Sequence, residues 1–363
     1  MRVLILSANT GRGHNSTAEA IAEQLRSMSV EYEIADTLAF ISEKVSNLIS
    51  RGHSYVYRRL PRLFGLGYRF EEKHAPRFIY EQCARGADAL QEKLAEDGYD
   101  AVICVHVFAG LMLTEVRHKY HSTVPAYFVA TDYTCSPGLA EMQLDGYFIP
   151  HSMLRGNFVR YGFLPADKIV VTGIPVRQEF CEHLDAREAR RALELPEEGK
   201  IVLLSCGSMG CGKLEKSAMM LYRGMPKGST LVVLCGKNEK TYEALAPHAC
   251  ENLRVLRFTD QIATYMAAAD LYLTKPGGLT TSEAIAKELP MMLIDAVPGL
   301  ETRNFNFLIA NGVADGTKSW RELTMLVQKG LTDPSAFDAQ REAMKTFTVK
   351  NAAELICRHV VKP

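Results

Sequence analysis

The chain has no excess of charge of either sign, because 42 Lys and Arg residues balance 42 Asp and Glu residues. Without a basic field it has little to attract a phosphate backbone, so we expect no nucleic-acid partner. It also lacks an uninterrupted apolar run of about 18 residues, the length that a membrane-spanning helix needs. The opening run, Met1–Ser7, is too short for a signal peptide, so we expect a cytoplasmic protein unless it binds a membrane surface.

Metal-ligand motifs are missing as well. The nine cysteines are scattered, and the closest pair, Cys206 and Cys211, has no His or second Cys pair at zinc spacing. Several of the others stand inside apolar runs, which is typical of reduced, buried thiols. We therefore predict no metal and no other cofactor.

What the chain does have is an alternation of short apolar runs with amphipathic segments. This pattern is typical of parallel sheets covered by helices on both faces. The strands expected in the first half are Val3–Ala8, Tyr32–Ala35, Ala101–Val105, Ala126–Ala130, Tyr147–Ile149 and Ile169–Val171. Those expected in the second half are Ile201–Ser205, Leu231–Leu234, Val255–Phe258, Leu271–Thr274 and Met291–Asp295.

The alternation predicts an α/β protein of two Rossmann-like domains, residues 1–175 and 176–363. A charged, helix-prone stretch at Leu184–Lys200 follows the boundary, which we place near Pro175. The tail after Asp333 is expected to be helical and leaves open a return to the first domain.

A basic, aromatic strip at 51–77 breaks the rhythm. Seven Lys or Arg residues stand against two acidic ones, with Tyr and Phe interleaved. Such a strip can lie on anionic lipid headgroups with its rings at the interface. A solvated helix face over ordinary core aromatics is the alternative. The members that we assign to acceptor or membrane contact are Arg58, Arg59, Arg62 and Tyr68.

A glycine-rich turn follows the first strand. Gly11 and Gly13, followed by Ser16, resemble a dinucleotide fingerprint without its third glycine, and Asp36 stands where a ribose-binding acid is expected. This leaves an NAD-dependent dehydrogenase as an alternative. His14 opens the next helix, where the helix dipole disfavours imidazolium. A neutral imidazole there can take a proton from a substrate hydroxyl, although a cap or core role is the competing interpretation.

A second glycine-rich turn, Cys206–Leu214, resembles the start of a P-loop. The residue after Lys213 must be Ser or Thr to hold magnesium, and it is Leu214. The mismatch argues against a P-loop NTPase and leaves a loop that can face a diphosphate without a metal.

The strongest local signal is the run Thr274–Glu283, which follows a strand and opens a helix. Gly277, Gly278 and the free N–H groups of the first helical turn form a nest for an anion. The spacing of Thr280 and Glu283 also fits a capping box. The alternative for Glu283 is contact with the ribose hydroxyls of a nucleotide.

Taken in order, these loops resemble one family, the diacylglycerol glycosyltransferases of the monogalactosyldiacylglycerol synthase and processive diacylglycerol β-glucosyltransferase type. The similarity to the lipid-linked N-acetylglucosaminyltransferase of peptidoglycan synthesis is more distant. The resemblance covers roughly Arg2 to Gly316. Its motifs are Thr10–His14, Ala130–Tyr133, Thr172–Arg177, Cys235–Asn238, Lys275–Glu283 and Pro298–Asn304.

The resemblance implies a GT-B fold, with two Rossmann-like domains facing each other across a cleft. It also implies inverting transfer of a hexose from a UDP-sugar to a lipid hydroxyl, with His14 as the general base. Asp132 and Tyr133 fall on the acceptor side. The donor-binding residues that it implies are Gly13, Ser208, Met209, Gly210, Gly236, Phe258, Thr259, Gly277, Gly278, Leu279, Thr280, Thr281, Glu283, Glu301 and Asn304.

Many relatives carry Gln where this chain has Glu301, so UDP-glucose and UDP-galactose both remain candidate donors. The implied partners are a UDP-hexose, a lipid acceptor, most directly diacylglycerol, and the anionic inner face of the cell membrane. A transferase or 2-epimerase acting on UDP-N-acetylglucosamine is the alternative within the same fold. A non-catalytic nucleotide-binding protein is the alternative outside enzymes. The oligomeric state is left open.

Overall fold

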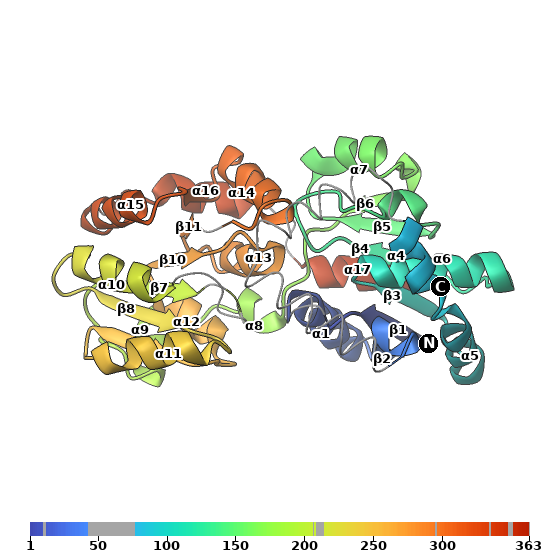
Figure 1. Cartoon of the computed structure of the whole chain (residues 1–363), viewed down its shortest axis with the longest axis horizontal. Helices are drawn as coiled ribbons and strands as arrows, with labels where there is room; N and C mark the ends of the chain where they lie inside the picture. The colour runs from blue at the N-terminus through green and yellow to red at the C-terminus, as the bar shows by residue number, and fades with distance from the viewer. Residues whose placement is uncertain are drawn as a thin grey trace. The chain divides into compact units, whose positions relative to one another are not determined.

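The computed structural model describes residues 1–9, 12–42, 77–205, 207, 214–294, 296–333, 335–347 and 351–362. They form two compact units, each an α/β structure with a parallel sheet between helices (Figure 1). Unit 1 consists of Met1–Gln178, Val297–Leu300 and Thr348–Pro363, and unit 2 of Glu179–Ala296 and Glu301–Phe347. The chain therefore first leaves unit 1 after Gln178, where the sequence had placed the boundary near Pro175.

The sheet of unit 1 has six parallel strands in the order β2-β1-β3-β4-β5-β6. Its central strands are continuous apolar runs because helices bury both faces of the sheet. The strands are β1 (Arg2–Ser7), β2 (Glu31–Asp36), β3 (Ala101–Cys104), β4 (Ala126–Val129), β5 (Gly146–Ile149) and β6 (Ile169–Val171).

The α-helices of unit 1 are α1 (Arg12–Ser27), α4 (Arg77–Ala84), α5 (Ala87–Asp97), α6 (Val107–Tyr120), α7 (Arg155–Tyr161) and α17 (Ala352–Val360). Helix α8 (Gln178–Cys181) follows at the boundary. Short 3-10 turns complete the unit: η1 (Thr37–Phe40), η2 (Leu139–Glu141), η3 (Ser152–Leu154) and η4 (Ala166–Lys168).

Helix α17 ends the chain but packs in the core of unit 1, against α1. Ile21 and Leu25 supply the stripe on α1, and Ile356, Cys357 and Val360 supply the facing side of α17. The tail after Asp333 is thus helical, and its last helix returns to the first unit.

The sheet of unit 2 is also parallel and six-stranded, in the order β12-β11-β10-β7-β8-β9. Its strands are β7 (Ile201–Ser205), β8 (Thr230–Leu234), β9 (Leu253–Leu256), β10 (Leu271–Thr274), β11 (Met291–Leu293) and β12 (Asp315–Gly316). Two expectations differ. Strand β9 ends before Phe258, which lies in the following loop, and β12 was not predicted because two residues without an apolar run give no sequence signal.

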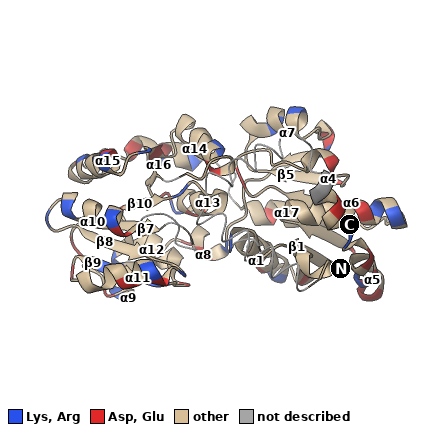
Figure 2. Cartoon of the chain, in the orientation of Figure 1, with Lys and Arg blue, Asp and Glu red and all other residues tan. Residues whose placement is uncertain are grey.

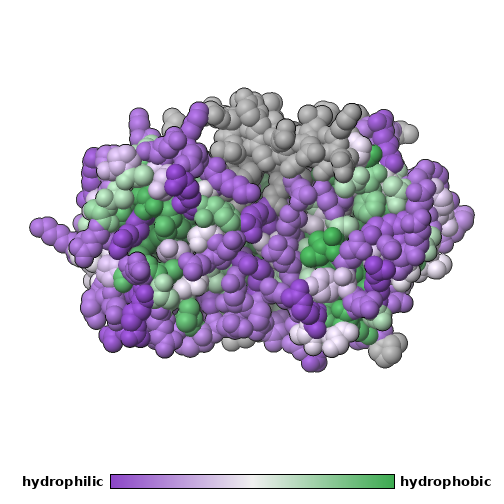
Figure 3. Space-filling model, turned by 90° about the horizontal axis from the view of Figure 1, so that it is seen from below, coloured by the Kyte–Doolittle hydropathy of each residue, from purple (hydrophilic) through white to green (hydrophobic). Residues whose placement is uncertain are grey.

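The helices of unit 2 are α9 (Ala186–Ala192), α10 (Leu214–Gly224), α11 (Glu239–Leu245), α12 (Ile262–Ala268), α13 (Gly278–Ala286), α14 (Leu300–Ala310), α15 (Trp320–Thr332) and α16 (Asp338–Phe347), with the 3-10 turn η5 (Ala246–His248). One core joins β7, β8 and β10 to α10 and α15. Basic and acidic residues are interspersed over the helices of both units (Figure 2). On the face shown in Figure 3, apolar residues form separate patches among hydrophilic ones.

Each sheet has one place where the direction of the strand order reverses. In unit 1 it lies between β1 and β3, and in unit 2 between β7 and β10. Open α/β sheets bind ligands outside the carboxyl ends of the strands at such a place. The loops that follow these four strands are therefore the expected ligand-binding positions. Within the described ranges, no helix is both long and apolar enough to cross a bilayer.

Candidate functional site

His14 lies in the first turn of α1, directly after β1 and thus at the reversal point of unit 1. Its Nδ1 is 2.9 Å from the carbonyl oxygen of Val105 and 3.2 Å from Oγ1 of Thr131. A carbonyl oxygen only accepts, so Nδ1 carries the proton and donates it. In the neutral ring, Nε2 is then the basic nitrogen, which is the tautomer that a general base needs.

A second histidine, which the sequence analysis missed, lies beside the first. His106 follows β3 and caps α6: its Nδ1 accepts a hydrogen bond from the N–H of Phe108 at 3.1 Å. The rings of His14 and His106 meet edge to face, with centroids 4.5 Å apart and planes at 74°. The available signal was a histidine directly after an apolar strand. Its proximity to His14 depends on β1 and β3 being neighbours, which the sequence does not reveal.

The loop after β4 completes this part of unit 1. Thr131 contacts His14, and Asp132 beside it is half-buried. Tyr133 is almost fully buried, which does not favour direct contact of its ring with a membrane surface. Its assignment to the acceptor side stays a prediction.

Asp36 serves the loop instead of presenting its carboxylate to a ribose. Its oxygens accept hydrogen bonds from the backbone and side-chain N–H groups of Asn9 at 3.3 and 2.9 Å, and from the N–H of Leu38 at 3.2 Å. It therefore caps η1 and fixes the end of β1. This local role accounts for Asp36 without a bound dinucleotide. The ribose-binding acid on which the dehydrogenase alternative depended is therefore already engaged within the loop.

Cys104 ends β3 next to this site and offers no nucleophile. Burial raises the pKa of its thiol far above the ordinary value, which keeps the thiol protonated. The same cause raises the pKa of Cys235, at the end of β8, to about 11. Both thiols are therefore poor nucleophiles.

In unit 2, the reversal point carries the loop between β10 and α13. Gly277 is the N-cap of α13, with φ −75° and ψ 137°, an extended conformation open to any residue. A Cβ built on Gly277 would meet no atom within 4 Å. Neither the backbone conformation nor the packing requires glycine at this position. Because Gly277 has no side chain, there is room for a ligand to approach the N–H groups of the helix.

Two details of this loop correct the sequence analysis. Because Gly277 is the N-cap, Thr280 stands inside the helix and the predicted capping box with Glu283 does not form. The hydroxyl of Thr281 donates to the carbonyl oxygens of Gly277 (2.8 Å) and Gly278 (3.1 Å), and that of Ser282 donates to Gly278 (2.8 Å). These hydroxyls face inward, so an anion here meets backbone N–H groups.

Helix α14 brings two of the predicted donor-binding residues, Glu301 and Asn304, to the same loop. Glu301 and Asn304 are both buried, one helical turn apart. The side-chain N–H of Asn304 donates to the carbonyl oxygen of Pro276 at 3.0 Å, which fastens α14 to the loop. Glu283 is buried on α13. The fold thus brings together the 275–283 loop and a helix that begins more than twenty positions later in the chain.

The loops after β8 and β9, at one edge of the sheet in unit 2, hold three of the predicted donor-binding residues. Gly236 follows β8 with φ +59°, a left-handed conformation that suits glycine. The Phe258 ring is partly exposed in the loop after β9, with the Lys237 ammonium 6.0 Å from its centroid. Thr259 is engaged locally, because its hydroxyl accepts from the N–H of Gln261 at 3.1 Å.

Several predicted residues fall outside the described residues: Ser208, Met209, Gly210, Arg58, Arg59, Arg62 and Tyr68. The described neighbour Gly207 has φ +74° at the end of β7. Over the described part of the chain, no group of three or more His, Cys, Asp or Glu side chains could hold a metal ion.

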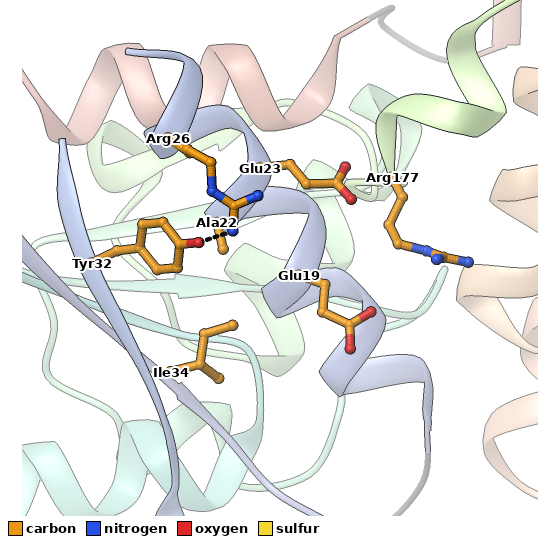
Figure 4. Close-up of a pocket in the computed structure, with 7 residues that line it drawn as sticks. All are labelled: Glu19, Ala22, Glu23, Arg26, Tyr32, Ile34 and Arg177. Atoms are coloured by element: carbon orange, nitrogen blue, oxygen red, sulfur yellow. Dashed lines mark hydrogen bonds between the residues drawn. The ribbon is translucent and has the colours of Figure 1, made fainter. Parts of the chain in front are cut away.

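A small hollow on unit 1 lies between α1 and β2 and is not lined by any of the predicted site residues (Figure 4). Its charged lining residues are Glu19, Glu23, Arg26 and Arg177. Glu23 accepts a hydrogen bond from the N–H of Gln178 at 2.9 Å, and Arg26 donates to the hydroxyl of Tyr32. These two hydrogen bonds engage Glu23 and Arg26 within unit 1.

Two parallel six-stranded sheets between helices, with His14 at the reversal point of one and the open amino end of α13 at that of the other, fit a glycosyltransferase of the GT-B fold. Residues 14–176 match the family model of monogalactosyldiacylglycerol (MGDG) synthase, and residues 201–356 match that of the glycosyltransferase family 28 C-terminal domain. Together the two models span most of the chain. They identify it as a glycosyltransferase, and the resemblance that the motifs indicated is confirmed.

Curated relatives of similar length support this assignment. A processive diacylglycerol beta-glucosyltransferase of Bacillus subtilis (strain 168) is 26% identical, with 99% of this chain and 95% of that protein covered. One of the same name from Bacillus cereus (strain B4264) is 28% identical, covering 97% and 91%. Among solved structures, Acinetobacter baumannii MurG matches with a TM-score of 0.65 at 17% identity, over 99% of both chains. That likeness confirms the fold.

Proposed function

We propose that this enzyme transfers a hexose from a UDP-sugar to the hydroxyl of diacylglycerol, with inversion, to give a β-glycosyl glycolipid. The observation that carries the proposal is the hydrogen bond from Nδ1 of His14 to Val105, which leaves Nε2 as the base at the reversal point of unit 1. The names of the full-length relatives support diacylglycerol as the acceptor and favour glucose over galactose.

On the donor side, the diphosphate binds at the amino end of α13. The open space at Gly277 lets phosphate oxygens approach the N–H groups, and the helix dipole stabilises the negative charge that develops on the leaving UDP. Glu283 holds the ribose and Phe258 stacks on the base. UDP is a fair leaving group, so no acid has to protonate the glycosidic oxygen.

On the acceptor side, Nε2 of His14 takes the proton from the lipid hydroxyl as its oxygen attacks the anomeric carbon. Attack comes from the face opposite UDP, and a single displacement inverts the configuration. The hydrogen bond from Nδ1–H to Val105 stabilises the imidazolium that forms. We assign His106 the role of holding the His14 ring in this orientation, through the edge-to-face contact.

We further propose that the reaction needs no metal, since backbone N–H groups and a helix dipole supply the positive potential that a divalent cation would otherwise provide. A lipid acceptor implies work at the membrane, and we propose peripheral attachment to the inner face of the cell membrane.

The test is sugar transfer to diacylglycerol in vesicles that contain anionic lipid, with EDTA present. UDP-glucose, UDP-galactose and UDP-N-acetylglucosamine are compared, for wild type and His14→Ala. We expect a β-glucosyl lipid from wild type and a fall in kcat of about 10²- to 10⁴-fold in the variant. UDP-sugar binding by isothermal calorimetry should be unchanged in His14→Ala.

Each other outcome has a consequence. Wild type that binds UDP-glucose without forming a glycolipid contradicts the lipid acceptor and favours another reaction of the same fold. Activity that EDTA abolishes contradicts the metal-free mechanism. Full activity in His14→Ala would contradict the proposal that His14 is the general base.

A further inference from the structure

The three most exposed large apolar side chains of the described residues lie in one short segment. Phe163 is 76% exposed, Met153 66% and Tyr161 62%, and these are the three highest values among the large apolar residues that the structure describes. All three belong to η3, α7 and the residues directly after α7. Burying them would be favourable, and the fold leaves them in water.

The backbone at Phe163 makes this exposure more informative. Its φ is +49°, in the left-handed region that costs bulky side chains most and that glycine usually occupies after a helix end. The neighbours hold it there: Leu164 is buried, and the N–H groups of Gly162 and Leu164 both reach the carbonyl oxygen of Phe158. A phenyl ring that is three-quarters exposed gains little from burial within the unit to offset this strain, which points to a contact outside the unit.

Basic side chains accompany these apolar ones. Arg155 and Arg160 are exposed on α7, and the only acidic residue between 152 and 167 is Asp167. The guanidinium of Arg160 lies 5.5 Å from the centroid of the Tyr161 ring, and Arg155 donates to the carbonyl oxygen of Ala166 at 2.7 Å. Figure 2 shows the basic residues on α7. Aromatic and apolar groups beside cations match the interface of an anionic bilayer, where rings sit at the headgroup level.

We propose that Met153, Tyr161 and Phe163, with Arg155 and Arg160, form a membrane-docking surface that inserts its apolar side chains into an anionic lipid bilayer. We call it the α7 surface. None of its residues belongs to the basic strip at 51–77. The proposal rests on the lipid acceptor proposed above. The segment begins after β5, at the carboxyl edge of the sheet that also carries His14, so docking through it brings that edge of unit 1 to the lipid.

The first experiment measures binding to vesicles with and without phosphatidylglycerol by flotation, for wild type, Phe163→Asn and Tyr161→Ser. Asn tolerates the left-handed region, so Phe163→Asn should unfold at the same or a higher temperature than wild type. Losing the insertion of one aromatic ring should weaken vesicle binding about tenfold or more. Met325→Ser, at a residue 55% exposed on α15, is the matched control and should bind as wild type does.

The second experiment separates docking from chemistry. Transfer is measured to long-chain diacylglycerol in vesicles and to a short-chain diacylglycerol dissolved as monomers. Phe163→Asn should lose activity about tenfold on vesicles and keep wild-type activity on the monomeric acceptor. Wild-type vesicle binding by Phe163→Asn, or an equal loss on both acceptors, overturns the proposal. If wild type glycosylates neither acceptor, the proposed function fails, while the flotation result still decides whether the α7 surface binds lipid.

Discussion

At the scale of single residues, the chemistry depends on which ring nitrogen carries a proton. A backbone carbonyl fixes Nδ1 of His14 as the donor, whereas a backbone N–H fixes Nδ1 of His106 as the acceptor. The two neighbouring rings are thus held in opposite tautomers, and only His14 presents a basic Nε2. Sequence alone identified His14 from its position after a strand. It contained no information on the tautomer, which depends on a partner 91 residues away.

Substitutions at His106 separate its ring from its cap. His106→Phe keeps an aromatic ring against His14 and loses the cap of α6, and His106→Asn does the reverse. We expect His106→Asn to lower kcat about 10- to 100-fold with the KM for UDP-sugar unchanged, because His14 loses its orientation. His106→Phe should keep most of kcat and lose about 1 kcal/mol in the free energy of unfolding. Steady-state kinetics and urea denaturation give both readings.

His151 is the matched control, because its Nδ1 caps η3 by accepting from the N–H of Met153 at 3.2 Å. The same two substitutions at His151 should change stability in the same direction and leave kcat alone. If activity at position 106 instead follows the cap, with His106→Asn active and His106→Phe inactive, the orienting role is wrong.

At the scale of elements, the strands and helices followed from apolar runs and helical spacing, since buried parallel strands must be apolar on both faces. The prediction that was wrong at this scale is the position at which α13 begins. Thr280 and Glu283 have the spacing of a capping box, but the helix begins at Gly278. The spacing of residues alone does not determine the position at which a loop ends and a helix begins. The approach of α14 to this loop was equally invisible, because one hydrogen bond between distant residues fixes it.

Gly277→Ala tests the open space at the amino end of α13. The position is unstrained and a methyl group meets nothing, so the free energy of unfolding should change by less than about 1 kcal/mol. A methyl group that keeps phosphate away from the N–H groups should raise the KM for UDP-sugar about tenfold.

Gly316→Ala is the contrasting variant, because its Cβ would meet the carbonyl oxygen of Leu293 at 2.7 Å. It should destabilise the protein by about 1–3 kcal/mol and leave the KM of the folded enzyme unchanged. An unchanged KM for UDP-sugar in Gly277→Ala would show that the diphosphate does not bind at the amino end of α13.

At the scale of the whole molecule, the two units differ in strand order although both are six-stranded and parallel. The sequence predicted two α/β domains because the alternation of apolar and amphipathic runs restarts. It did not determine the order of strands in either sheet, nor that the last helix belongs to the first unit. The strand orders depend on pairs such as β1 with β3 and β7 with β10. The place of the last helix depends on contacts such as that of Cys357 with the Ile21 carbonyl, 336 positions apart.

Ile356→Ala tests the return of α17. Ile356 is fully buried against α1, so its truncation should cost about 2–5 kcal/mol in the unfolding of unit 1. Leu355, its exposed neighbour, should tolerate alanine within about 0.5 kcal/mol. Circular dichroism follows both units, while fluorescence of the single tryptophan, Trp320 on α15, follows unit 2. Equal effects of the two substitutions would contradict the packing of α17 on α1.

The same helix dictates the order in which the protein can be completed during synthesis. Unit 1 is begun first, yet the ribosome releases its closing helix last, after all of unit 2. Until then the apolar stripe of α1 lacks its partner helix, and the nascent unit leaves part of the core around Ile21 and Leu25 open to water and to other chains. A chain cut short near its end therefore carries a finished second unit and an unfinished first one.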